Sequence, residues 1–251
     1  MKIKCLTCEA LVRLVYHYAA QSPHMIDVSI FRLGLHNQPD DLRTRLQHAI
    51  DLASVPEDGI SYQAIVLAYG LCGRATDGLV ARSIPLVIPR AHDCITLFLG
   101  SRQKYLEQHE NNPGTYWYAL DYIERGRSSG VRVSLGAESS APDMQTVYEE
   151  YVKKYGQDNA DYLMEVMGAW QSYYRRAALI NLGIGDISSV ESIAREEAAH
   201  RNWTFEQING DPILIQRLLN GDWNTDFLIV QPGERIQMVS TTEILRSAPL
   251  T

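Results

Sequence analysis

Short apolar runs alternate with amphipathic stretches through the first half of the chain. Residues 64–68 (AIVLA) form a continuous apolar run, which is typical of a parallel strand covered on both faces. Between the strand-like residues 25–33 and this run, Leu42, Leu46 and Ile50 recur every four positions, which predicts a helix. The first half therefore predicts repeated βα units.

The last third returns to the same alternation after a helical middle. Helical periodicity covers residues 144–176, strands are predicted at 177–182, 203–208 and 227–230, and a helix is predicted at 188–200. Strands and helices that alternate on both sides of a helical middle predict an α/β fold, with parallel sheets flanked by helices.

The domain organisation has two interpretations. A length of 251 residues suits one α/β domain over residues 1–251, and it also suits two halves, 1–124 and 143–251. Residues 125–142 are rich in Arg, Ser and Gly and lack a clear period, so they are predicted to be a lid or a linker.

Composition narrows the classes of partner. The net charge of -7, from 23 basic and 30 acidic residues, opposes attraction to phosphate backbones, so no nucleic acid is expected as a partner. No segment reaches the roughly 18 uninterrupted apolar residues that cross a bilayer, and no secretory leader is recognised. We therefore expect a cytoplasmic protein whose four cysteines are thiols or metal ligands rather than disulfides.

Three of the four cysteines follow strand-like runs. Cys8 ends IKCLTC, Cys72 lies in AYGLCG, and Cys94 follows PLVIPRAHD together with His92. The carboxyl ends of parallel strands meet at one edge of a sheet, where open α/β proteins bind their ligands. Thiolate and imidazole ligands suit zinc or an iron–sulfur cluster. The predicted metal ligands are therefore Cys8, Cys72, Cys94 and His92, with Cys5 as a substitute or resolving thiol.

Two other interpretations of the cysteines stay open. Free cysteine is among the most buried residue types, so these residues also suit an apolar core. Alternatively, Cys72 or Cys94 is a nucleophile with His92 as its base, although the neighbouring Asp93 points to the opposite face of an extended chain. A helix start near Cys72 is expected to lower the pKa of its thiol, which helps a ligand or a nucleophile.

Three further residues are predicted to contact a substrate. Arg90 offers a planar fork of donors to an anion, and His36 follows the second strand, where it suits a fourth ligand or an acid. Asp93 lies between the two predicted ligands of the RAHDC segment. The predicted substrate-binding residues are thus Arg90, Asp93 and His36.

The segments AYGLCG, PRAHDCITLFLGS and PGTYW resemble a family catalogued as a domain of unknown function (DUF1638). Members look like single α/β proteins that are often encoded near corrinoid methyltransferase systems. The resemblance implies that Cys8, Cys72, His92, Asp93 and Cys94 belong to the family pattern. It also implies a corrinoid protein or methyltransferase as partner, in C1 or methyl-group metabolism. The alternative is an accessory or metal-delivery protein without catalysis.

Overall fold

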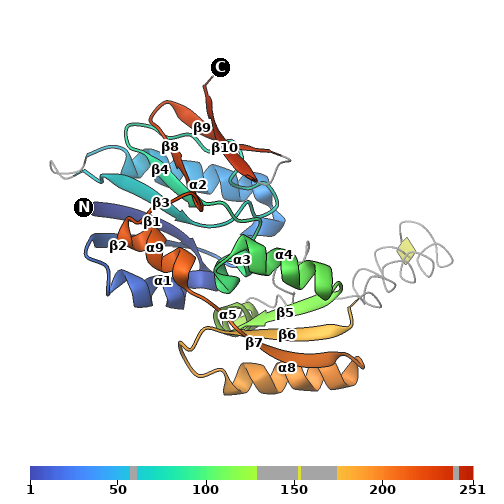
Figure 1. Ribbon diagram of the computed structural model, residues 1–251. Coiled ribbons are helices and arrows are strands. Elements are labelled where there is room, and N and C mark those ends of the chain that lie inside the picture. Colours follow the sequence, from blue (N-terminus) through green and yellow to red (C-terminus); the bar gives the residue numbers. More distant parts are fainter. Residues whose placement is uncertain (57–60, 129–151, 154–173, 240–242, 251) are drawn as a thin grey trace.

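The computed structural model describes residues 1–56, 61–128, 152–153, 174–239 and 243–250 (Figure 1). Most of the predicted helical middle and most of the predicted lid, residues 125–142, lie outside these residues. Residues 125–128 end a helix, α5 (Leu120–Ser128). Among the described residues, no helix is both long and apolar enough to span a membrane.

The larger sheet has five strands in the order β2-β1-β3-β4-β8 (Figure 1). Their bounds are Lys2–Cys8 (β1), Met25–Phe31 (β2), Ala64–Ala68 (β3), Leu86–Pro89 (β4) and Phe227–Val230 (β8). The first four run parallel to one another, and β8 pairs with β4 in the antiparallel sense. The sheet confirms the predicted α/β class.

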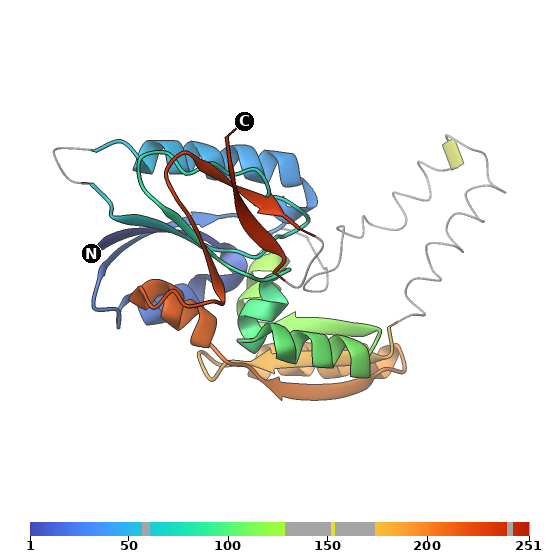
Figure 2. The same cartoon turned by 45° about the horizontal axis from the view of Figure 1, so that its top comes forward.

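Helices cover both faces of this sheet (Figure 2). Helix α1 (Val12–Ala19), preceded by a short 3-10 turn η1 (Glu9–Leu11), and helix α9 (Ile213–Asn220) cover one face, and α2 (Pro39–Ala53) covers the other. Successive side chains of a strand point to opposite faces. Val66 accordingly packs on the side of α1 and α9, whereas Ile65 and Leu67 pack on the side of α2.

A second sheet has three parallel strands in the order β5-β6-β7. These are β5 (Thr115–Ala119), β6 (Arg176–Asn181) and β7 (Thr204–Asn209), and α8 (Ser188–His200) packs against one face. The opposite face joins the core beneath α1 and α9. The five-stranded and the three-stranded sheet each combine strands that precede residues 125–142 with strands that follow them. In the first, β4 pairs with β8, and in the second, β5 pairs with β6.

Two local features differ from what the sequence pattern indicates. The apolar pattern of residues 95–109 suits one helix, but this stretch is divided into α3 (Cys94–Leu99) and α4 (Arg102–Asn111). Gly100 ends α3 in the left-handed region at φ 72°, and the Ser101 hydroxyl then caps α4. The hairpin of β9 (Glu234–Met238) and β10 (Leu245–Pro249) was not expected either.

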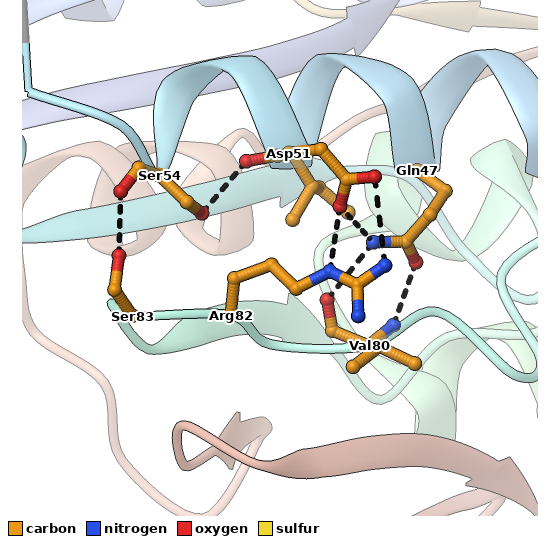
Figure 3. A network of polar contacts seen from close by, with 7 residues as sticks. Gln47, Asp51, Ser54, Val80, Arg82 and Ser83 are labelled. Atoms are coloured by element: carbon orange, nitrogen blue, oxygen red, sulfur yellow. Dashed lines mark hydrogen bonds and ion pairs between the residues drawn. The ribbon is translucent and has the colours of Figure 1, made fainter.

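A polar network attaches the second half of α2 to residues 80–83, which lead into β4 (Figure 3). The Asp51 carboxylate accepts hydrogen bonds from Arg82 Nε at 2.7 Å and from Gln47 Nε2 at 2.8 Å. The Gln47 amide oxygen in turn accepts the Val80 backbone N–H at 2.8 Å. The hydrogen bond from Arg82 holds the pKa of Asp51 below its usual value. The network therefore fixes the connection between β3 and β4.

We expect Asp51→Asn to lower the free energy of unfolding by about 0.5–1 kcal/mol near pH 7, a modest loss because both partners are nearly half exposed and screened by solvent. The folded-state pKa of Asp51 lies below the unfolded value of about 4, so the stabilisation is present above that value and is lost as the pH falls through the folded pKa. Urea unfolding from about pH 7 down to about pH 3 should therefore show the two proteins converging.

The matched control is Asp41→Asn on the same helix, since Asp41 pairs with Arg45 within the helix only. Its effect should be about 0.3–0.5 kcal/mol or less. A difference between wild type and Asp51→Asn that stays constant down to about pH 3 would contradict this account.

Candidate thiol-lined site

A cavity of about 400 Å³ lies at the carboxyl ends of β1 and β3. The chain passes from β1 to β2 in one direction across the sheet, and β3 and β4 then extend it in the other direction. In open α/β sheets, such a change of direction opens a crevice at the strand ends, where ligands bind. The cavity thus occupies the position that the topology favours.

Loops from four strands build its wall. They contribute Cys8 after β1, residues 32–37 after β2, residues 69–73 after β3 and residues 92–94 after β4, and Tyr122 of α5 adds to the wall. Six of the seven residues predicted to form the site line this one cavity: Cys8, His36, Cys72, His92, Asp93 and Cys94. Residues distant in the sequence therefore meet here.

The loops after β3 and β4 are joined along their backbones. Leu71 N–H donates to the Ala91 carbonyl at 2.8 Å, and Cys72 N–H donates to the His92 carbonyl at 3.0 Å. A Cβ atom on Gly70 would lie 2.7 Å from the backbone nitrogen of Asp93, which is closer than real Cβ contacts. Only glycine permits this approach, so Gly70 is what lets the two cysteine-bearing loops touch.

The turn that carries Cys72 has an unusual backbone. Cys72 has a φ of 45° and Arg74 a φ of 72°, both in the left-handed region that residues with a Cβ rarely adopt. Each such residue costs about 1–2 kcal/mol, so the surrounding structure must hold the turn in place. The Thr76 hydroxyl does so in part, because it donates to the Gly70 carbonyl at 3.2 Å. Strain of this kind is often found at functional sites.

The three thiols of the cavity are protonated at neutral pH. Burial raises the pKa of Cys8 to about 11 and that of Cys72 to about 12, and it raises the pKa of Cys94 well above its usual range. The lowered pKa expected for Cys72 is therefore wrong, because burial dominates. The thiolate form of Cys8 would raise the pKa of Cys72 further, and those of Cys72 and Cys8 would raise the pKa of Cys94, because the three thiols are near one another.

The two imidazoles differ in their surroundings. His36 lies in the short 3-10 turn η2 (Leu35–Asn37), and its Nε2 atom is buried without a hydrogen-bond partner in the part of the chain that the structure describes. Burial lowers the pKa of His36, which keeps the ring neutral. His92 is exposed at the rim, where its ring centroid lies 6.1 Å from that of Tyr105. His36 is thus the imidazole with an unused buried nitrogen.

Asp93 has a structural role in the site. Its carboxylate accepts the Thr96 backbone N–H at 3.2 Å as the N-cap of α3, and the Tyr105 hydroxyl donates to it at 3.3 Å. Burial raises the pKa of Asp93. These contacts fix the start of α3, and with it Cys94.

Arg90 and Cys5 do not line the cavity. The Arg90 guanidinium donates to the backbone carbonyls of Glu243, at 3.1 Å, and of Leu245, so it holds the β9–β10 hairpin. Cys5 is fully buried in the core shared with α1 and α9, because it lies three residues before the strand end that carries Cys8. Arg90 therefore stabilises the hairpin, and Cys5 packs in the hydrophobic core.

The lining residues that were not predicted from the sequence include Asn37, Tyr69 and Tyr122. The Tyr69 hydroxyl and Asn37 Oδ1 are buried without a hydrogen-bond partner among the described residues. Tyr69 directly follows the apolar run of β3, as Cys8 ends β1, and this position is the signal that would have identified it. Tyr122 gave no such signal, because its place depends on how α5 packs.

The described residues contain no group of three or more His, Cys, Asp or Glu side chains arranged so that it could hold a metal ion. The three thiols share the cavity but do not converge on one point. A change of side-chain rotamer at one or more cysteines would be needed for joint ligation.

The fold and cavity define a class, namely an α/β protein with a thiol-lined pocket at the carboxyl edge of its parallel strands. The family model described as "Protein of unknown function (DUF1638)" matches residues 30–219, which is well over half of the chain. The chain belongs to this family, and the resemblance noted from its motifs is confirmed. No curated protein and no solved structure matches the chain.

We expect Gly70→Ala to separate the two cysteine-bearing loops, because the new methyl group would overlap the backbone of Asp93. The free energy of unfolding should fall by about 1–3 kcal/mol, and Cys72 and Cys94 should react faster with a bulky disulfide reagent. The control, Gly183→Ala, has a φ of 68° but open space around it, so it should cost about 1 kcal/mol of strain and leave thiol reactivity unchanged. Unaltered thiol reactivity in Gly70→Ala would refute the role given to Gly70.

In metal-free protein, iodoacetamide should alkylate Cys8, Cys72 and Cys94 slowly at about pH 7. The rate should rise about tenfold per pH unit up to about pH 9, since it follows the thiolate fraction, and the pKa is raised to about 11 for Cys8, to about 12 for Cys72 and well above its usual range for Cys94. Peptide mapping by mass spectrometry measures each rate. Fast labelling of Cys72 or Cys94 at about pH 7, abolished in His92→Ala, would instead support a cysteine nucleophile.

Proposed function

We propose that the cavity binds a thiophilic metal, either a zinc ion or an iron–sulfur cluster, through Cys8, Cys72 and Cys94. The observation that carries this proposal is the arrival of three thiols from three different strand ends at one buried cavity. Thiolates select zinc and iron–sulfur clusters over harder cations.

The raised pKa values favour a metal ligand over a nucleophile. A nucleophilic cysteine needs a depressed pKa, and such thiols lie near positive charges or helix starts in partly open surroundings. Here desolvation keeps all three thiols protonated, including Cys94, although it begins the short helix α3. A bound cation would supply the missing positive charge, because metal binding deprotonates coordinating thiols. These half-buried, neutral thiols therefore suit a site that ionises only when the metal enters.

His36 is the better candidate than His92 for a fourth ligand. A neutral imidazole is the form that binds a metal, and His36 is neutral because burial lowers its pKa. Its Nε2 atom lacks a hydrogen-bond partner among the described residues, whereas His92 is exposed at the rim. Because the present thiol arrangement does not hold an ion, we propose that metal entry turns the cysteine side chains inward and recruits His36.

The cavity is larger than an ion requires. Its volume of about 400 Å³ lies within the range of small-molecule pockets, about 300–1,000 Å³. Apolar side chains form much of its wall: Ala10, Leu11, Leu33, Leu35, Leu42 and Ala68. We propose that a small ligand shares the cavity with the metal. A corrinoid or methyltransferase partner, and C1 chemistry, stay predictions from the family resemblance.

We expect protein purified without oxygen to contain about one metal centre per chain, measured by elemental analysis. Alanine in place of Cys8, Cys72 or Cys94 should remove most of the metal, because each variant leaves only two thiolates of the set. An absorption spectrum separates the two forms, since an iron–sulfur cluster is coloured and zinc is not. The alternative fourth ligands are compared in His36→Ala and His92→Ala, of which the former should lose more metal.

Cys5→Ala is the matched control, because it removes a buried thiol outside the cavity and should leave the metal content unchanged. Circular dichroism and the urea midpoint establish that each variant is folded. Folded wild-type protein that contains no metal, and that takes up neither zinc nor iron on addition, would refute the proposal.

A further inference from the structure

A second hollow, of about 540 Å³, lies beside the thiol-lined cavity and shares Pro39 and Gly73 with it. It is bounded by the first turn of α2, by residues 73–78 and by residues 235–238 of β9. Backbone bonds hold these segments together, since Gly78 N–H donates to the Ile236 carbonyl at 2.8 Å. The segments that bound the hollow are therefore held together by the fold itself.

Three arginines and two aspartates are the charged residues that line this hollow in the described part of the chain. Arg43 pairs with Asp40 at 2.8 Å, and Arg74 pairs with Asp77 at 3.1 Å. Asp77 also accepts the Met238 backbone N–H at 2.9 Å, so its carboxylate is fully engaged. Arg235 has no carboxylate partner among the described residues. The hollow thus carries one positive charge in excess, in a chain whose net charge is -7.

Two guanidinium groups here have unused donors. The Nε atoms of Arg43 and Arg235 are both buried, and neither has a hydrogen-bond partner in the described ranges of the chain. A buried charged donor without an acceptor is costly, and it is rare in native structures unless a water or ligand completes it. Both arginines line the hollow. Arg235 has no side-chain hydrogen bond or ion pair within the described ranges, so its outer N–H groups are free to meet an acceptor in the hollow.

We propose that this hollow binds an oxyanion, the phosphate or carboxylate group of a small ligand, through Arg235 and Arg43. Arginine presents its N–H groups in a planar fork that matches the oxygens of either group. The volume exceeds that of the anion alone, so the rest of the ligand has room beside it. This anion site does not require the proposed metal, although it lies directly beside the thiol-lined cavity.

The experiment is titration calorimetry of the full chain with inorganic phosphate and, separately, with acetate, at constant ionic strength set by sodium chloride. Wild-type protein should show saturable binding of at least one of these anions beyond the chloride control. Arg235→Met should weaken it roughly tenfold or more, because a charge-assisted hydrogen bond is lost. Arg45→Met, on the exposed side of α2 and outside the hollow, should bind as wild type does.

Phosphate binding without acetate binding assigns a phosphorylated ligand, and the reverse assigns a carboxylate. If Arg235→Met fails to fold, Arg235→Lys decides, since it keeps the charge but loses the planar fork and should bind more weakly than wild type. No saturable binding of either anion, or equal binding by wild type and a folded Arg235 variant, would overturn the proposal. Metal content in Arg235→Met should match wild type, and Cys72→Ala should still bind the anion, so the two proposals fail separately.

Discussion

The backbone at Gly70 and the backbone at Asp93 approach so closely that any side chain at position 70 would collide with them. Backbone hydrogen bonds from Leu71 to Ala91 and from Cys72 to His92 then join the loop after β3 to the loop after β4. Cys72 and Cys94 thereby belong to one rigid unit, although 21 residues separate them in the sequence. Cys8 joins them because β1 lies next to β3 in the sheet. The thiol-lined cavity follows from this one contact between two loops.

The same packing sets the chemistry of the site. Because both faces of the sheet are covered, a ligand can reach the strands only at their ends. In this protein, neighbouring loops and helices cover much of those ends as well. Burial keeps the thiols protonated and the His36 imidazole neutral, so these side chains carry little charge at neutral pH. Among the described residues, some buried polar atoms without a hydrogen-bond partner belong to residues that line the two adjoining hollows, such as the Tyr69 hydroxyl in one and Arg235 Nε in the other. Elsewhere the fold satisfies comparable groups, as the network around Asp51 shows (Figure 3).

The hydrophobic pattern was sufficient to predict the α/β class and most strands of the two larger sheets, because their apolar runs are short and well separated. Strand ends then identified six of the residues that line the cavity. The pattern could not reveal Arg90 as a support for β10, since that contact joins residues more than 150 positions apart. It likewise missed the β9–β10 hairpin. It also missed Asp93 as the N-cap of α3, although this contact is local, because Asp93 accepts from the Thr96 backbone N–H three positions along the chain.

The proposal that Cys8, Cys72 and Cys94 bind a metal can be tested by X-ray absorption spectroscopy of protein purified without oxygen, because this method reports which atoms surround a bound metal. The account predicts a zinc or iron edge with a shell of sulfur scatterers at about 2.3 Å, accompanied for zinc by a nitrogen neighbour at about 2.0 Å. This sulfur shell should be lost when Cys72 is replaced by alanine. A metal surrounded only by nitrogen and oxygen, or a sulfur shell that persists in Cys72→Ala, would contradict the account.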